Sequence, residues 1–175
     1  RYLLCDVAKQ DNSAGGKGLN VARVIKLCGV DSKATGLVGG FNGQYLESLL
    51  DADGINHEFG HIQGETRSCI NILDPGYGST EYLEGGCNVT KEEEADFLNK
   101  FPEIIKDSDV VIDAFGAWTE ETLPQHSTSL KHLCDILSGT NIRLLIVGGA
   151  GSLYVNPEHT LCVSDGPDFP DIFKP

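Results

Sequence analysis

Methionine is absent from this chain of 175 residues, tryptophan occurs once, and aromatic residues make up only 7% of the sequence. The chain begins at Arg1 and contains no initiating methionine, so we expect a fragment of a longer protein or a processed chain. Basic residues are also scarce, with 13 Lys and Arg against 26 Asp and Glu and a formal net charge of −13. Since nucleic-acid binders carry a basic face, this balance argues against a nucleic-acid partner. An anionic ligand must instead be held by local donors against an unfavourable overall field.

Long apolar runs and metal-binding cysteine spacings are missing as well. No stretch reaches the length of a membrane span and no signal peptide is visible, so we expect no membrane partner. The six cysteines form no C-x-x-C pair, and the histidines are better explained by surface or packing roles, so no metal ligand is assigned. Cys28, Cys69 and Cys134 fall in apolar patterns and are predicted to be buried free thiols of a cytoplasmic protein.

A glycine-rich stretch over residues 14–22, Ala-Gly-Gly-Lys-Gly-Leu-Asn-Val-Ala, is the strongest local pattern in the chain. Apolar residues recur at helical spacing over residues 21–28, and Gly29 follows where a helix-ending glycine is expected. The pattern predicts a glycine loop that leads into a helix over residues 19–28. Unpaired backbone N–H groups at such a helix start attract anions, most often phosphate, and Lys17 adds a positive charge. A tight turn before a buried helix is the alternative.

Strands and helices alternate along the rest of the chain. The helices are expected over residues 44–53, over residues 91–105 behind a capping box that starts at Thr90, and over residues 123–137. The strands are expected over residues 33–38, 55–62, 66–73, 80–83 and 109–112, with a turn at residues 39–43. The alternation predicts an α/β fold with a mainly parallel sheet and flanking helices in three layers, as in Rossmann-like and ribokinase-like proteins.

Three strings carry a family resemblance. They are residues 15–23 (Gly-Gly-Lys-Gly-Leu-Asn-Val-Ala-Arg), residues 33–43 (Lys-Ala-Thr-Gly-Leu-Val-Gly-Gly-Phe-Asn-Gly) and residues 64–72 (Gly-Glu-Thr-Arg-Ser-Cys-Ile-Asn-Ile). These strings resemble the PfkB (ribokinase-like) sugar kinases, in particular the branch of 1-phosphofructokinase and tagatose-6-phosphate kinase. The resemblance covers about residues 1–112. It implies a small β lid at about residues 55–84, phosphotransfer from ATP with Mg²⁺ to a phosphorylated ketohexose, and a homodimer formed through the lid.

The resemblance also implies a set of substrate-binding residues. Gly15, Gly16 and Asn20 would hold sugar hydroxyls. Arg67 would reach the sugar or its phosphate, since a guanidinium binds oxyanions with two parallel hydrogen bonds. An exposed strand arginine without a ligand is the alternative for Arg67. The full set of substrate-binding candidates is Gly15, Gly16, Lys17, Asn20, Gly40, Asn42, Arg67 and Asn71.

The kinase resemblance ends at a strand near residue 112, because residues 113–118 do not continue the family's pattern. Residues 110–116 (Val-Val-Ile-Asp-Ala-Phe-Gly), the expected helix and residues 143–154 (Arg-Leu-Leu-Ile-Val-Gly-Gly-Ala-Gly-Ser-Leu-Tyr) resemble NAD(P)-binding Rossmann reductases of the atypical short-chain, NmrA-like kind. This second resemblance implies NADP(H) as an alternative cofactor. Its cofactor-binding candidates are Gly116, Gly148, Gly149 and Gly151.

The chain therefore looks chimeric, with a PfkB-like part over residues 1–112 and a reductase-like segment over residues 113–175. No catalytic residue is assigned. The kinase family carries a C-terminal Gly-Ala-Gly-Asp, and the nearest string here ends in Ser152 in place of the aspartate. A serine hydroxyl is too weak a base to replace that carboxylate unaided, so we expect the kinase to be incomplete or inactive. The alternatives are an NAD(P)-binding reductase-like protein and a noncatalytic chimeric α/β scaffold.

Overall fold

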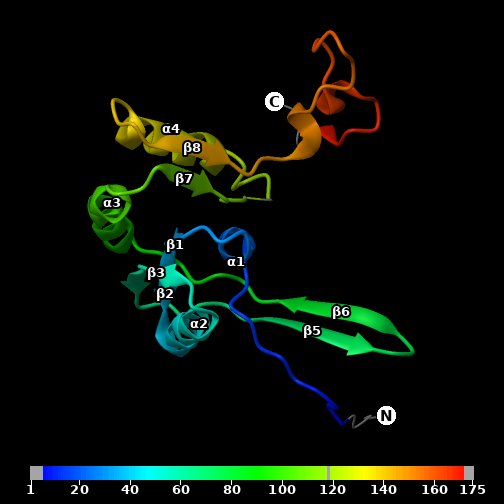
Figure 1. Cartoon of the computed structure of the whole chain (residues 1–175). Helices are drawn as coiled ribbons and strands as arrows, with labels where there is room; N and C mark the ends of the chain where they lie inside the picture. Colours follow the sequence, from blue (N-terminus) through cyan, green and yellow to red (C-terminus); the bar gives the residue numbers. More distant parts are fainter. Residues whose placement is uncertain (1–5, 118, 172–175) are drawn as a thin grey trace. The chain divides into compact units, whose positions relative to one another are not determined.

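The computed structural model describes residues 6–117 and 119–171 (Figure 1). The chain forms two compact units, Arg1–Lys106 and Asp107–Pro175. The apolar piece at residues 2–5 and the single tryptophan, Trp118, lie outside the described residues. Among the described residues, no helix is long and apolar enough to cross a membrane.

The N-terminal unit alternates helices with short strands. Its elements are α1 (Lys17–Leu27), β1 (Lys33–Ala34), β2 (Leu37–Gly39), α2 (Gly40–Asp53), β3 (Asn56–His57), β4 (Gly60–Ile62), β5 (Cys69–Asp74), β6 (Gly78–Leu83) and α3 (Lys91–Ile105). β1 pairs in parallel with β3, and β2 pairs in parallel with β4. Between the two ladders, Gly60 N donates to Gly36 O at 2.9 Å, so the ladders follow one another along the same two segments. The two strands expected over residues 33–38 and 55–62 are each split in two.

The β5–β6 hairpin lies within residues 55–84, where the sequence predicts a β lid. Its strands pair antiparallel from Cys69↔Leu83 to Asp74↔Gly78, and every residue in both strands is exposed. Asp74 Oδ1 accepts hydrogen bonds from the backbone N–H groups of Gly76 (2.7 Å) and Tyr77 (2.9 Å), which closes the turn. Figure 1 shows the hairpin extending away from α1 and α2.

The helix α2 begins at Gly40, four residues earlier than the sequence predicts. The turn expected at residues 39–43 is therefore wrong for most of its length. The Glu65 side chain explains the difference, because its carboxylate accepts a hydrogen bond from the Asn42 backbone N–H in the first turn of α2. A carboxylate at a helix start satisfies an otherwise unpaired donor and suits the helix dipole. The helix ends at Gly54 in the left-handed region (φ 62°), as expected.

The core of the N-terminal unit is formed by residues of α1, β1 and α2 and of the segments next to them. Leu50 is fully buried (0% exposed). It clusters with Ala14, Ala22, Ala34 and Ile55, and the partly buried Leu19, Leu46, Leu49 and Phe59 pack against this cluster. The burial predicted for several residues is wrong. Cys28, Cys69 and Cys134 are predicted to be buried but are exposed. In α1 only Ala22 is buried, and Cys69 lies on a hairpin that is open on both faces.

The capping box of α3 is confirmed. Thr90 Oγ1 accepts from the Glu93 backbone N–H at 3.2 Å, and Glu93 Oε2 accepts from the Thr90 backbone N–H at 2.8 Å. The Glu93 carboxylate also accepts from the Gln63 backbone N–H at 2.7 Å. The hydrogen bond from Gln63, followed by those from Thr90, lowers the pKa of Glu93. A lowered pKa means that this cap contributes stability above the ordinary glutamate pKa and loses it as the pH falls through the folded-state value.

The C-terminal unit contains β7 (Val110–Asp113), α4 (Gln125–Leu137) and β8 (Arg143–Ile146), followed by two short 3₁₀ turns, η1 (Ala150–Ser152) and η2 (Val163–Asp165). β7 and β8 pair in parallel, as βαβ connectivity requires. The strand expected at residues 109–112 is present as β7. Its first residue, Val110, is exposed, and the rest of the strand is half-buried.

Candidate functional site

The glycine loop forms the start of α1. Gly16 is the residue that precedes the helix, with φ 110° and ψ 155°, a conformation that L side chains rarely adopt. A Cβ built at Gly15 or Gly16 would meet no atom within 4 Å, so the loop faces open space. The first turn of α1 contains no acidic residue, and the helix carries the basic residues Lys17, Arg23 and Lys26. The helix dipole and the charge of Lys17 at the helix start favour an anion at the glycine loop, despite the negative net charge of the chain.

Arg23 connects this loop to the end of α2. Its Nη2 donates to Ala14 O at 2.6 Å, its Nη1 donates to Asn20 Oδ1 at 3.1 Å, and its Nε pairs with Asp53 Oδ2 at 3.1 Å. The candidate Asn20 is thus held through its side-chain oxygen, which leaves its amide nitrogen to donate to a ligand.

A second group of candidates lies at the start of α2. Two hydrogen bonds join Gly39 and Thr66: Gly39 N donates to Thr66 Oγ1 and Thr66 N donates to Gly39 O, both at 2.9 Å. Gly40 adopts φ 68°, and a Cβ there would overlap the Glu65 carboxylate. Asn42 Nδ2 donates to Thr66 O at 2.9 Å and to Ser68 Oγ at 3.0 Å. The absence of a side chain at Gly40 therefore makes room for Glu65, and the Asn42 amide holds the segment that follows β4.

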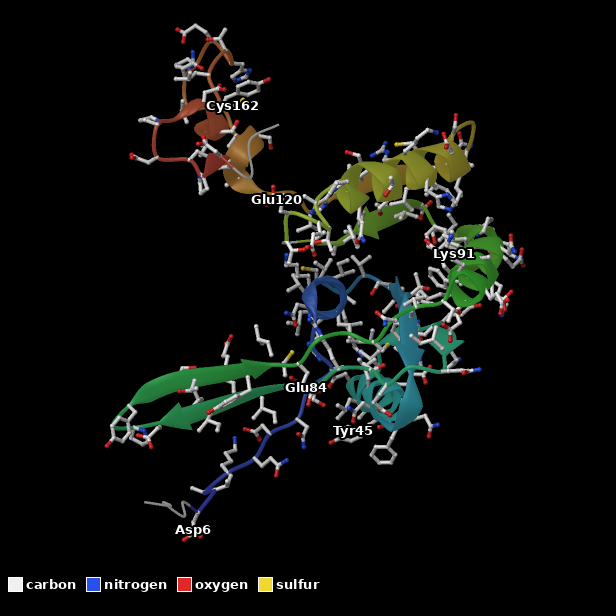
Figure 2. The ribbon with its side chains drawn as sticks, turned by 180° about the vertical axis from the view of Figure 1, so that it is seen from behind. Asp6, Tyr45, Glu84, Lys91, Glu120 and Cys162 are labelled. Carbon is white, nitrogen blue, oxygen red and sulfur yellow. The ribbon has the colours of Figure 1, made fainter. Side chains whose placement is uncertain are left out.

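Hydrogen bonds hold the backbone on both sides of Arg67. Its neighbour Thr66 is bound to Gly39, and Ser68 N donates to Glu84 Oε2 at 2.8 Å at the base of the hairpin (Figure 2). The Arg67 side chain is exposed, and within residues 6–117 and 119–171 its guanidinium makes no hydrogen bond or ion pair. The backbone on both sides of Arg67 is thus held by hydrogen bonds, while its side chain is exposed to solvent. A guanidinium in this position is able to bind an anion.

The two groups lie toward the same edge of the parallel ladders. Lys26 Nζ donates to the backbone carbonyls of Asp53 and Gly54, the latter at 2.6 Å, so the C-terminal ends of α1 and α2 meet. Both helices also pack on the strands that they precede or follow. Their N-terminal ends, with the two glycine turns, therefore lie toward the edge where β2 ends. Asn71 lies further out on the hairpin, where its Oδ1 accepts from Ser79 Oγ at 2.7 Å.

The cofactor candidates lie in the C-terminal unit. Gly116 follows β7, and Gly148 and Gly149 follow β8. A Cβ built at Gly148 or Gly149 would meet no atom within 4 Å. Because β7 and β8 are parallel, these glycines share the carboxyl edge of the pair. Gly151 differs, since a Cβ there would lie 2.9 Å from the Phe169 ring.

These residues do not fit an ATP and Mg²⁺ site. The turn η1 is only three residues long, and the Ser152 hydroxyl donates to Gly149 O at 3.4 Å. Phe169 covers Gly151, so this stretch does not present the open helix start that holds phosphate. Among the described residues, no group of three or more His, Cys, Asp or Glu is arranged to hold a metal ion. His61 pairs with Glu47 at 3.0 Å instead.

Residues 3–112 match the family described as pfkB family carbohydrate kinase. The chain belongs to this family. The matched residues include all eight substrate-binding candidates and both glycine turns. The α/β fold is also that of solved structures to which the chain is similar, and the predicted kinase resemblance is confirmed.

Among curated proteins, the chain is 41% identical to the tagatose-6-phosphate kinase of Staphylococcus epidermidis over 106 residues. These residues are 61% of this chain and 34% of the relative, so the match spans about one third of the relative's length. Among solved structures, a possible 1-phosphofructokinase from Thermotoga maritima has a TM-score of 0.62 at 26% identity, over 97% of this chain and 50% of that one. The phosphofructokinase-2 of Escherichia coli, solved with fructose-6-phosphate, shares the fold at a TM-score of 0.54 and 21% identity.

The predicted reductase resemblance gains little from these comparisons. A candidate NADH-flavin reductase from Streptococcus pneumoniae reaches a TM-score of only 0.42, which carries no argument about fold or cofactor. The division of the chain at residue 112 into two ancestries stays a prediction.

Sequence reasoning missed two residues that organise the site. Glu65 caps α2, and Arg23 anchors the glycine loop. Both lie inside the strings that carried the family resemblance, but each contacts residues outside its own immediate pattern.

Proposed function

We propose that this chain forms the sugar-phosphate-binding part of a pfkB-type kinase that acts on a phosphorylated ketohexose. Arg67 carries the proposal. Its backbone is held between two hydrogen-bonded neighbours, and its guanidinium has no carboxylate partner among the described residues. An exposed guanidinium whose backbone is tied to the glycine turn at the start of α2 matches the needs of a phosphate that must be bound and oriented. The basic helix α1 adds attraction for the same anion.

The relatives support the substrate class. The chain is similar to a tagatose-6-phosphate kinase over the region that contains every substrate candidate. The kinase family implies ATP as the phosphoryl donor, and we propose that Mg²⁺ accompanies it to neutralise the phosphate charge. Because Ser152 stands in place of the family's aspartate and Phe169 covers Gly151, we expect this chain to bind the sugar phosphate without transferring a phosphoryl group to it.

Arg67→Ala tests the proposal. In thermal unfolding, the wild-type chain is expected to gain melting temperature with tagatose 6-phosphate, fructose 6-phosphate or fructose 1-phosphate, since a ligand that binds only the folded state stabilises it. Loss of one charge-assisted contact weakens binding by about tenfold to a hundredfold, so the shift should largely disappear in the variant. Arg143→Ala is the matched control, because Arg143 is also an exposed arginine and lies in the other unit.

Other ligands separate the alternatives. A cooperative unfolding transition that ignores all three sugar phosphates, ATP with Mg²⁺ and NADPH would identify a noncatalytic scaffold. A shift with NADPH alone would favour the reductase-like interpretation. An unchanged sugar-phosphate shift in Arg67→Ala would remove Arg67 from the site.

We further propose that the chain forms a homodimer through the β lid. Ile70, Ile72 and Tyr82 share one face of the hairpin and are 54%, 51% and 57% exposed. On the opposite face, polar Asn71, Ser79 and Glu81 interrupt the apolar residues. A continuous apolar face with nothing over it is typical of a protein–protein contact.

Ile72→Glu is expected to convert the dimer to a monomer in sedimentation velocity, because the new charge would be buried unpaired in the contact. Leu73→Glu is the matched control, since Leu73 is the next residue of β5 and lies on the other face. A monomeric wild-type chain, or equal effects of the two variants, would argue against this face as the dimer contact.

A further inference from the structure

We propose that Arg23 is a positioning residue of the sugar-phosphate site, which fixes the glycine loop and aims the Asn20 amide at the ligand. The inference rests on the proposed function. Arg23 itself makes no contact with the ligand. It acts through Ala14 and Asn20, the two residues that its guanidinium binds on either side of the glycines.

The glycine loop needs an anchor from outside. Gly15 and Gly16 have no side chains, and no atom lies within 4 Å of the space that a Cβ would fill. Glycine also loses more conformational freedom on ordering than other residues. A loop of this kind keeps a single shape only where its ends are held. Ala14, 2% exposed, is held at one end by the core cluster and by the bond from Arg23 Nη2 to its carbonyl at 2.6 Å.

The same guanidinium sets the orientation of the Asn20 side chain. Arg23 Nη1 donates to Asn20 Oδ1 at 3.1 Å, which a rotated amide could not accept. The Asn20 amide nitrogen is therefore left as the donor, and donors are what a hydroxyl oxygen or a phosphate oxygen requires. Without Arg23 the amide could turn either end toward the ligand, and one of the two orientations would repel an anion.

The ion pair with Asp53 explains why Arg23 serves as an anchor. Asp53 Oδ2 lies 3.1 Å from Arg23 Nε, and Asp53 is the last residue of α2. The pair ties the guanidinium to a second helix and offsets its charge, so that Arg23 does not compete with Arg67 or Lys17 for the phosphate. Lysine could not replace it, since only the planar guanidinium donates in three fixed directions at once.

The experiment measures tagatose 6-phosphate binding to the full 175-residue chain by calorimetry, with fructose 6-phosphate and fructose 1-phosphate as further probes. The variants are Arg23→Lys, Asn20→Ala, the double variant and Asp53→Asn. We expect Arg23→Lys to weaken binding by about tenfold. Asn20→Ala should weaken it by a similar factor, and the double variant should be weaker than Asn20→Ala by clearly less than the factor that Arg23→Lys causes alone. That lack of additivity identifies a residue that acts through Asn20.

Asp53→Asn is the control for stability. It removes the charge of the ion pair while the contacts from Arg23 to Ala14 and Asn20 remain, so its melting temperature should fall as in Arg23→Lys while its affinity stays near the wild-type value. Equal weakening by Asp53→Asn, wild-type affinity in Arg23→Lys, or additive effects in the double variant would each overturn the role of Arg23 and leave the proposed function intact. A wild-type chain that binds none of the three probes would overturn both.

Discussion

Gly39→Ala is expected to destabilise the N-terminal unit by roughly 3 kcal/mol or more, because no space exists for a methyl group at this position. A Cβ there would overlap the backbone carbonyl oxygens of Gly64 and Ile62 and would lie 2.9 Å from Ile62 Cγ1. Backbone atoms of a paired strand cannot move aside as the end of a flexible side chain can. The substitution would also separate Gly39 from Thr66, which are joined by two hydrogen bonds of 2.9 Å.

The measurement is urea unfolding, followed by amide hydrogen exchange in α2 so that the N-terminal unit is observed separately. Gly15→Ala is the matched control, because a Cβ at Gly15 meets no atom within 4 Å. Its effect on stability should stay within about 0.5 kcal/mol. Equal protection of α2 in the two variants would show that β2 and the segment after β4 do not approach as closely as described.

The same substitution tests the link between fold and site. The two hydrogen bonds between Gly39 and Thr66 hold the backbone next to Arg67. At temperatures where Gly39→Ala remains folded, its affinity for sugar phosphates should still fall, because the guanidinium is displaced from the start of α2. Gly86→Ala gives the comparison for affinity, because a Cβ at Gly86 also meets no atom within 4 Å and Gly86 is not a substrate-binding candidate.

Local patterns predicted the helices and the glycine loop well, because their causes lie within a few residues. The capping box at Thr90 needs only Glu93, three residues on, and the end of α2 needs only Gly54. The start of α2 failed for the opposite reason. Its cap comes from Glu65, 23 residues beyond Asn42, and no local pattern contains that contact.

Burial was predicted less well than secondary structure. Apolar spacing assigns a residue to a face, but another element must cover that face before the residue is buried. Cys69 follows a strand pattern on a hairpin that has no cover on either side among the described residues. The substrate candidates were placed by family resemblance, and the structure adds what a string cannot show: Asn42 holds the segment around Arg67, and Arg23 holds Asn20.

Leu50→Ala is expected to cost about 3 kcal/mol of stability and to weaken sugar-phosphate binding as well. Leu50 is 0% exposed and packs in the cluster that contains Ala14, Ala22 and Ile55. Removing its branched end leaves a cavity in this cluster. Because Ala14 shares that cluster and precedes the glycine loop, the cavity loosens the loop that the ligand contacts.

The measurement pairs urea unfolding with calorimetric binding of tagatose 6-phosphate. Leu27→Ala is the matched control, since Leu27 is a helical leucine of the same unit that is 86% exposed. Its stability should change by no more than about 0.5 kcal/mol and its affinity should stay unchanged. A Leu50→Ala variant that loses stability yet binds the sugar phosphate as the wild type does would show that the anchor of the glycine loop is Arg23 alone. Loss of both would show that the core and the guanidinium hold the loop together.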